Sequence, residues 1–137
     1  MSADLQRLQE AIHARLTADA DVTAALGGAK VYDRPPQGAS MPYITFGATR
    51  TFDAGTSTED AREHLLTVHI WSKTGGRKEC MDIMQAAGEA LAGIPALSGT
   101  VRIVSLRRQA DDIVYEPDLR AWHGVIRLRA LTEAVSL

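Results

Sequence analysis

The sequence has a single cysteine, Cys80, among its 137 residues. One thiol cannot form a disulfide within the chain or supply a cysteine-rich zinc site. No apolar run approaches the roughly 20 residues that a membrane-spanning helix needs. Residues Met1 to Asp4 open an amphipathic pattern rather than a basic segment followed by an apolar one, so we predict no secretory signal. We therefore expect a protein with no membrane contact, acting in the cytoplasm where it is made.

An excess of charge of one sign is also missing. The formal net charge is only -2, and nothing suggests the clustered basic face that holds a nucleic-acid backbone. Specific binding to DNA is therefore disfavoured. Hydrophobic residues make up 45% and charged residues 23% of the chain, which is ordinary for a globular protein and excludes wholesale disorder. The length fits a single domain over residues 1–137.

The motifs of common catalytic and cofactor sites are absent. The sequence has no Walker or dinucleotide-binding glycine pattern, no Gly-x-Ser-x-Gly elbow and no calcium-binding loop. Residues 75–78, at the start of an expected helix, offer backbone amides to an anion, but a turn that leads into a helix explains them better. Four acidic residues near an expected hairpin turn are candidates for a cation site, although charged turns are usually only solvated: Asp111, Asp112, Glu116 and Asp118. We predict no catalytic residue, no cofactor and no metal ion.

Histidine and cysteine give no site either. His64 and His69 lie on one expected strand at positions of opposite parity, so they point to opposite faces of the sheet and cannot converge on a metal ion. Cys80 lies near a helix start with Arg77 and Lys78 close by, where a thiolate is stabilised. It also falls on the apolar stripe of that helix. We therefore predict an inert, buried thiol.

Residues 62–73 carry the clearest pattern in the chain. Leu66, Val68 and Ile70 occupy even positions, whereas the odd positions are mostly polar. This period of two predicts a central strand with one buried face. Leu65 and Trp71 interrupt the polar side, so we expect the second face to contact something other than water. That half-apolar face is therefore the predicted site of function.

Two main helices are predicted from apolar residues that recur at intervals of three and four. The first covers residues 2–16, and its stripe consists of Leu5, Leu8, Ile12 and Leu16. The second covers residues 77–92, and its stripe consists of Cys80, Met84, Ala87 and Leu91. Between them, residues 19–26 predict a short helical turn that ends at Gly27-Gly28.

Further strands are predicted on both sides of the central one. Residues 31–33 form a short candidate, and residues 42–48 alternate, with Ile44, Phe46 and Ala48 on one side. Residues 100–116 are strand-like but change phase, which predicts a bulge. A turn at residues 116–119 then closes a hairpin onto a strand over residues 120–131. The order of elements predicts an α+β fold: two layers, with a mostly antiparallel sheet of about four to five strands and two main helices packed on one face.

Residues 49–61 are the least core-like part of the chain. Thr, Asp, Gly, Ser and Glu dominate, and only Phe52 is large and apolar. A connection of this length is usually functional or disordered. We predict a loop that reaches a neighbouring protein and becomes ordered on docking; a mobile loop that binds nothing is the alternative. Its predicted contact residues are Thr51, Phe52, Asp53, Ser57, Glu59 and Asp60.

Several motifs, read together, resemble one protein family. They are Pro35-Pro36-Gln37-Gly38, Met41-Pro42-Tyr43, His69-Ile70-Trp71-Ser72, Gly75-Gly76 before a helix, and Tyr115-Glu116-Pro117-Asp118. In this order and at these separations they resemble the tail completion or tail terminator proteins of phages with long non-contractile tails, known also from prophages and gene transfer agents. The similarity spans nearly the whole chain. Leu119 departs from the pattern, since such turns more often carry glycine.

The resemblance implies a structural virion protein. It would form a ring, usually hexameric, that caps the finished tail tube, stops its polymerisation and joins the tail to the head connector. Its partners would be copies of itself, the tail tube protein and a head-completion or stopper protein of the connector. The ring would lie at the head-proximal end of the virion tail after assembly in the bacterial cytoplasm. DNA would pass through its channel without specific contacts.

In such a ring, one patch of each copy meets a different patch on the next copy. We predict that the half-apolar face supplies one of these patches, because tryptophan and arginine are favoured at protein contacts. Its residues are Leu65, His69, Trp71, Val125, Arg127 and Arg129. The alternative is that the protein's own loop covers them. Two other functions stay open at this stage: a small cytoplasmic enzyme or ligand-binding domain, and an adaptor of another tail-like system.

Overall fold

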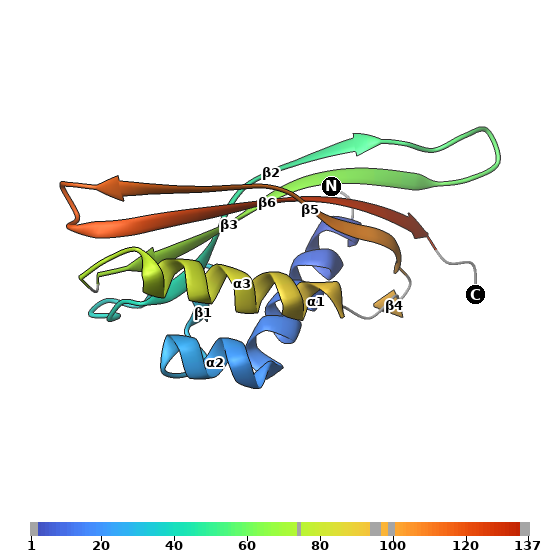
Figure 1. Ribbon diagram of the computed structural model, residues 1–137. Helices are drawn as coiled ribbons and strands as arrows, with labels where there is room; N and C mark the ends of the chain where they lie inside the picture. Colours follow the sequence, from blue (N-terminus) through green and yellow to red (C-terminus); the bar gives the residue numbers. More distant parts are fainter. Residues whose placement is uncertain (1–2, 74, 94–96, 99–100, 135–137) are drawn as a thin grey trace.

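The computed structural model describes residues 3–73, 75–93, 97–98 and 101–134. Its helices are α1 (Ala3–Ala18), α2 (Ala20–Leu26) and α3 (Lys78–Ala92). Its strands are β1 (Val31–Tyr32), β2 (Tyr43–Asp53), β3 (Ala61–Ser72), β4 (Leu97–Ser98), β5 (Val101–Glu116) and β6 (Ala121–Ala134). Figure 1 shows the long strands as one layer and the helices as a second layer against it.

The strands form one sheet in the order β1-β2-β3-β6-β5-β4. Each neighbouring pair is antiparallel except β1 and β2, which run parallel. In the described part of the chain, β2, β3, β6 and β5 are long, and a two-residue strand lies at each edge. This α+β arrangement, a mostly antiparallel sheet with its helices on one face, confirms the predicted fold class.

β3 is the central strand that the period of two predicts. It pairs with β6 along its whole length and with β2 on its other side. Leu66, Val68 and Ile70 face the helices and are at most 4% exposed. The intervening residues are only partly buried on the other side. One face of the sheet therefore builds the core, and the other is left uncovered by the helices.

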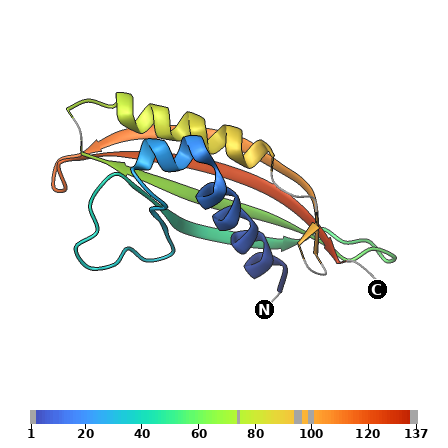
Figure 2. The same ribbon diagram turned by 90° about the horizontal axis from the view of Figure 1, so that it is seen from below.

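The helices cover one face of the sheet because each main helix buries its predicted stripe there (Figure 2). Leu8, Ile12 and Leu16 of α1 are fully buried. The stripe of α3 is also buried, and Ile83 and Ala90 extend it. Full burial of one such aliphatic side chain contributes about 1.5 to 3 kcal/mol, so this layer supplies much of the stability. No helix within the described residues is long and apolar enough to cross a membrane.

The short helix α2 is capped at both ends. Asp19 Oδ1 accepts a hydrogen bond from the backbone N–H of Val22 at 3.0 Å, which satisfies a free donor of the first turn. Gly27 ends the helix with φ of 78°, a left-handed conformation that glycine adopts without a steric penalty. The predicted glycine stop is confirmed.

β2 is longer than predicted, and most of the predicted loop at residues 49–61 is not a loop. β2 continues to Asp53, paired with β3, so residues 54–60 alone form the turn of a hairpin. A bulge between Phe46 and Thr49 shifts the alternation of side chains by one residue. The apolar period breaks there although the backbone pairing goes on. For this reason the prediction of a loop was wrong in its first part.

β5 changes phase as predicted. Its register with β6 shifts between Ile103 and Ser105, and again between Arg108 and Ala110. Each shift inserts an extra residue that bends the strand and increases its twist. The regular alternation of β5 side chains between the two faces of the sheet is therefore interrupted at each bulge.

The turn between β5 and β6 explains the departure at Leu119. Backbone hydrogen bonds run from Leu119 N to Glu116 O and from Arg120 N to Pro117 O, both at 3.2 Å. The positive φ of this turn, 49°, belongs to Arg120 and not to Leu119. A glycine is therefore not required at position 119, and the predicted hairpin forms.

Candidate functional site on the outer face of the sheet

The outer face is the side of β2, β3, β6 and β5 that the helices leave uncovered (Figure 1). Odd-numbered residues of β3 and β6 point to this side, since the even-numbered ones point to the core. The backbone register places Leu65 opposite Arg129 and His69 opposite Val125. All residues of the predicted contact surface therefore share one face: Leu65, His69, Trp71, Val125, Arg127 and Arg129.

Three stacked rings lie on the outer face at the end near the β5–β6 turn. The ring centroids of Trp71 and His123 are 3.9 Å apart and the planes differ by 9°. The His69 centroid lies 4.8 Å from that of His123. Trp71 Nε1 donates to Thr45 Oγ1 at 3.2 Å, and His123 Nδ1 lies 3.1 Å from Glu116 Oε1. The stack is thus held by partners on β2 and β5.

Sequence reasoning missed one ring of this stack, His123, and the two residues that hold the stack in place, Thr45 and Glu116. Alternation along β6 places His123 on the outer face, but it does not show that His123 is opposite Trp71. Thr45 and Glu116 come from two further strands. Their contacts depend on the pairing of four strands, which no local pattern records.

His69 fits against β2 because residue 47 is glycine. A Cβ atom on Gly47 would lie 2.0 Å from His69 Nε2 and 2.8 Å from Thr67 Oγ1. Burial lowers the pKa of His69, and the nearby His123 and Arg127 lower it further. A lowered pKa favours the neutral imidazole, which can stack among other rings without bringing a buried charge.

Arg127 and Arg129 extend the outer face away from the stack. Arg127 Nε is 3.4 Å from Asp112 Oδ2, and Arg129 pairs with Glu63. The two arginine side chains remain 52% and 47% exposed. Exposed ion pairs of this kind contribute roughly 0 to 1 kcal/mol. The guanidinium groups can therefore exchange these partners for carboxylates of another protein at small cost.

Leu65 lies in a shallow hollow of the outer face between Arg50 and Arg127. Thr67 and Gln109 are among the residues that line the rest of this hollow. An apolar floor with guanidinium groups on its rim can accept an apolar side chain together with a carboxylate.

The acidic residues near the hairpin turn do not gather into a cation site. Asp111 faces the helix side and binds Arg108 at 2.6 Å, whereas Asp112 faces outward. Glu116 pairs with His123 instead. Across the described ranges, no group of three His, Cys, Asp or Glu side chains is placed to hold a metal ion.

The residues of the predicted partner-contacting loop are split between a strand and a turn. β2 holds Thr51, Phe52 and Asp53, and the turn holds Ser57, Glu59 and Asp60. Phe52 points outward with the Arg50 guanidinium 4.8 Å from its ring centroid. Thr51 points to the core side, where its hydroxyl lies 3.0 Å from His64 Nδ1. These residues therefore do not form one continuous surface.

Comparison of the sequence with known protein families matches residues 10–133 to the family described as tail completion protein gp17. The chain belongs to this family. It is therefore a structural protein of a phage-type virion tail, and the family and tail location predicted from the sequence motifs are confirmed. A comparison with curated protein sequences returns no match.

Two solved structures share the fold of this tail completion protein. A chain from the virion of a native gene transfer agent particle is 24% identical and gives a TM-score of 0.89, with 98% of this chain and 100% of that chain covered. The bacteriophage SPP1 gp17 protein is 20% identical and gives a TM-score of 0.61, with 98% and 93% covered. The described fold thus recurs over at least 93% of the length of each of these two proteins.

The tail completion protein ties α1 to the sheet through a buried histidine at the end opposite the ring stack. Thr132 Oγ1 donates to Asp4 Oδ2 at 3.2 Å and therefore accepts from His64 Nε2 at 2.9 Å. His64 Nδ1 then accepts from Thr51 Oγ1 at 3.0 Å. His64 is fully buried, and burial lowers its pKa. Its position in the core, with His69 on the outer face, confirms that the two histidines point to opposite sides.

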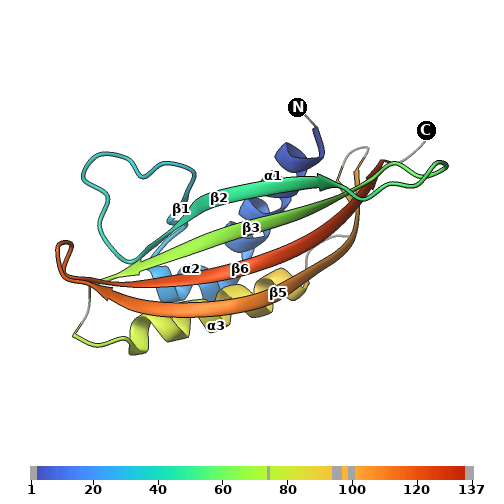
Figure 3. The ribbon, with the colours of Figure 1, turned by 90° about the horizontal axis from the view of Figure 1, so that it is seen from above.

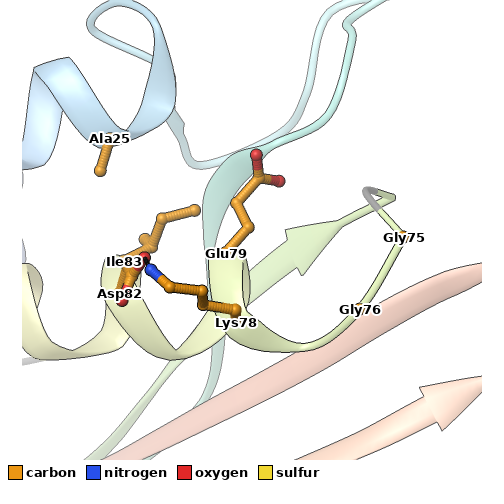
Figure 4. Close-up of a pocket in the computed structure, with 7 residues that line it drawn as sticks. All are labelled: Ala25, Gly75, Gly76, Lys78, Glu79, Asp82 and Ile83. Carbon is orange, nitrogen blue, oxygen red and sulfur yellow. Dashed lines mark hydrogen bonds and ion pairs between the residues drawn. The ribbon is translucent and has the colours of Figure 1, made fainter.

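The start of α3 in the tail completion protein is unsuited to an anion (Figure 4). The open pocket there is lined by Ala25, Gly75, Gly76, Lys78, Glu79, Asp82 and Ile83. Lys78 Nζ is 2.7 Å from Asp82 Oδ2, and Glu79 Oε1 accepts from Ser72 Oγ at 2.5 Å. Two carboxylates against one ammonium give the pocket negative charge. This supports the interpretation of residues 75–78 as a turn before a helix.

Cys80 lies in the core beneath β6. Its side chain is fully buried, and its Sγ is 2.8 Å from the position that a Cβ on Gly124 would take. Burial raises the pKa of the thiol to about 11. The predicted burial of Cys80 is confirmed, and a thiol with this pKa is a poor nucleophile at neutral pH.

Proposed function

We propose that this tail completion protein assembles into a hexameric ring at the head-proximal end of the tail. There it caps the tail tube, stops its polymerisation and joins the tail to the head connector. The family match over residues 10–133 carries this proposal. The partners are further copies of the chain, the tail tube protein and a head-completion or stopper protein. The role is structural rather than catalytic and uses no cofactor.

The two ends of the sheet differ in a way that suits a cap between unlike partners. The β2–β3 turn, residues 54–60, is polar and exposed. The β5–β6 turn carries Leu119, whose side chain is 50% exposed. The two turns project from opposite ends of the sheet (Figure 1). Polymerisation stops when a final ring matches the tube on one side and presents a different surface on the other.

The outer face is our candidate for contact between neighbouring copies. Trp71 offers an aromatic surface, and the hollow at Leu65 has arginine side chains on its rim. Tryptophan and arginine are the residue types that contribute most to protein contacts. DNA passes through the ring without specific contacts, in keeping with a net charge of -2.

Removal of the gene from a particle-producing cell tests the tail role. We expect DNA-filled heads and separate tails, and joined particles again when the wild-type chain is supplied. Electron microscopy of particles with a tagged chain should show a ring between tail tube and connector. Normal particles in the absence of the protein, or a tagged chain at the far tip of the tail, would overturn the proposal.

A further inference from the structure

The sheet ends in a long open strand. β4 pairs with β5 only at Val101 and Arg102. Among the residues that the structure describes, no strand pairs with the free side of β5 over residues 103–116. Figure 3 shows β5 as one margin of the sheet. Such a margin presents a row of unpaired backbone N–H and C=O groups that another strand can use.

The first half of this margin is protected and the second half is not. Two bulges precede Ala110, and Arg107 and Arg108 add charge. Bulges and charges are the usual devices that keep an edge strand from pairing. From Ala110 to Glu116 the pairing with β6 is regular, and Val114 is 49% exposed. A regular edge with an exposed apolar side chain suits a strand that is covered in an assembly.

β2 forms the opposite margin (Figure 3). β1 pairs only with Ile44 and Thr45, so within the described residues the free side of β2 is open from Phe46 onward. Successive antiparallel pairings along β2, β3, β6 and β5 make β2 and β5 run in opposite directions. A rotation about an axis parallel to the strands leaves these directions unchanged. When two neighbouring copies are related by such a rotation, β2 of one copy can therefore lie antiparallel to β5 of the next copy.

The geometry points to one continuous antiparallel sheet across the seam between two copies, with residues 110–113 of one copy paired to residues 49–52 of the next, beyond the bulge of β2. After its bulge, β2 turns Arg50 and Phe52 to the outer face, opposite Leu65 and Glu63 of β3. β5 turns its even-numbered residues from 110 onward to the same face. The two margins can therefore join without exchanging their core and outer sides.

Charge selects the register of this seam. Arg50 directly opposite Asp112 brings unlike charges together and sets Phe52 opposite Ala110. A shift of two residues is the smallest that keeps each side chain on its own face. Such a shift places Arg50 opposite Ala110 or Val114, and neither charge then has a partner across the seam. Cross-strand pairs of opposite charge are stabilising, whereas unmatched ones are not.

This inference rests on the proposed assembly of copies into a ring, and it narrows the contact between copies to the two sheet margins and the outer-face residues beside them. Asp112 already pairs with Arg127 of its own copy at 3.4 Å. Arg50 of the next copy would approach the same carboxylate from the open side of β5. One carboxylate would then lie between two guanidinium groups, and the outer-face residue Arg127 would lie beside the seam.

Disulfide formation in isolated particles tests the seam. The double variant Arg50→Cys with Asp112→Cys places two thiols directly opposite each other across it. We expect mild oxidation to give a ladder of covalent oligomers on a non-reducing gel. The matched control is Arg50→Cys with Asp111→Cys, which moves the second thiol by one residue to the other side of the sheet. We expect no ladder from that control or from either single variant, because Cys80 is buried.

The outcomes separate the seam from the tail role. Two results would overturn the seam and leave the tail role intact. In the first, particles carry the variant chain at the tail end but give no ladder. In the second, both double variants give equal ladders. The same oxidation is applied to the purified chain in concentrated solution. A ladder specific to the Arg50 and Asp112 pair there, with the chain absent from particles, would support the seam and overturn the tail role.

Discussion

Gly47 shows how a single missing side chain shapes the outer face. The His69 ring is held by its stack on His123 and occupies the space beside Gly47. We expect Gly47→Ala to lower the free energy of unfolding by about 1 to 3 kcal/mol in urea denaturation, because an added methyl group forces a fixed ring to move. Gly76→Ala is the matched control, since a Cβ there meets nothing within 4 Å. Equal urea midpoints for the two variants would contradict the argument.

His64 and His69 make the stability of the fold sensitive to acid. The pKa of each is lowered below the ordinary value of 6.5, in both cases mainly by burial. At pH values between the lowered pKa of the folded chain and 6.5, the unfolded chain binds more protons than the folded chain. The contribution to stability is therefore complete above pH 6.5 and is lost as the pH falls through this window. For each histidine, the free energy of unfolding changes by at most about 1.4 kcal/mol per pH unit.

Urea denaturation near neutral pH and about two units lower measures this effect. We expect the difference in unfolding free energy between the two conditions to shrink in His64→Asn and to shrink again in the double variant with His69→Asn. Comparing differences removes the loss of stability that each substitution causes at every pH. The same difference in all three proteins would show that neither histidine is responsible.

At the scale of elements, the sequence predicts what a local pattern decides. The even-numbered apolar residues of β3, the stripe of α3 and the phase change in β5 all fix which side of an element is buried. Partner strands are not encoded in this way. The extension of β2 to Asp53 was missed because the bulge after Phe46 disrupts the period of two while β3 still supplies hydrogen-bond partners.

The outer-face site was predictable to the same extent. Alternation along β3 and β6 is enough to place Leu65, Trp71 and Arg127 on one side. The contacts that shape this surface, such as Trp71 with Thr45, join residues far apart in the sequence. They depend on the register between strands, which follows from the packing of the whole sheet. Composition gave no signal for them.

The hairpin turn at residues 54–60 is an element that can be shortened without touching the core. We expect deletion of residues 55–59 to leave a folded, soluble chain, because Asp53 and Arg62 can stay paired while Ala54, Asp60 and Ala61 close a three-residue turn between them. In the proposed cap this turn contacts a partner, so particles made with the shortened chain should be separate heads and tails. Circular dichroism checks the fold and electron microscopy checks the particles. Joined particles would show that the turn is not needed.

The whole molecule divides its charges between two surfaces. On the helix side, Arg7 and Lys78 are exposed and pair with carboxylates of their own helices. On the outer face, Arg127 and Arg129 pair with carboxylates of neighbouring strands. Both kinds of pair are weak in isolation. The two kinds of pair differ in their surroundings, since Arg127 on the outer face borders the apolar hollow at Leu65, whereas Arg7 and Lys78 on the helix side do not.

This difference leads to a prediction about assembly. We expect Arg127→Ser with Arg129→Ser to change the free energy of unfolding by no more than about 1 kcal/mol per pair, yet to abolish joined particles, because the contact between copies loses its cations. Arg7→Ser with Lys78→Ser removes the same charge from the helix side and serves as the control. Its particles should be normal. Urea denaturation gives the stability of both variants, and counting joined particles by electron microscopy gives their assembly. If the two variants assemble equally well, the outer face is not the contact between copies.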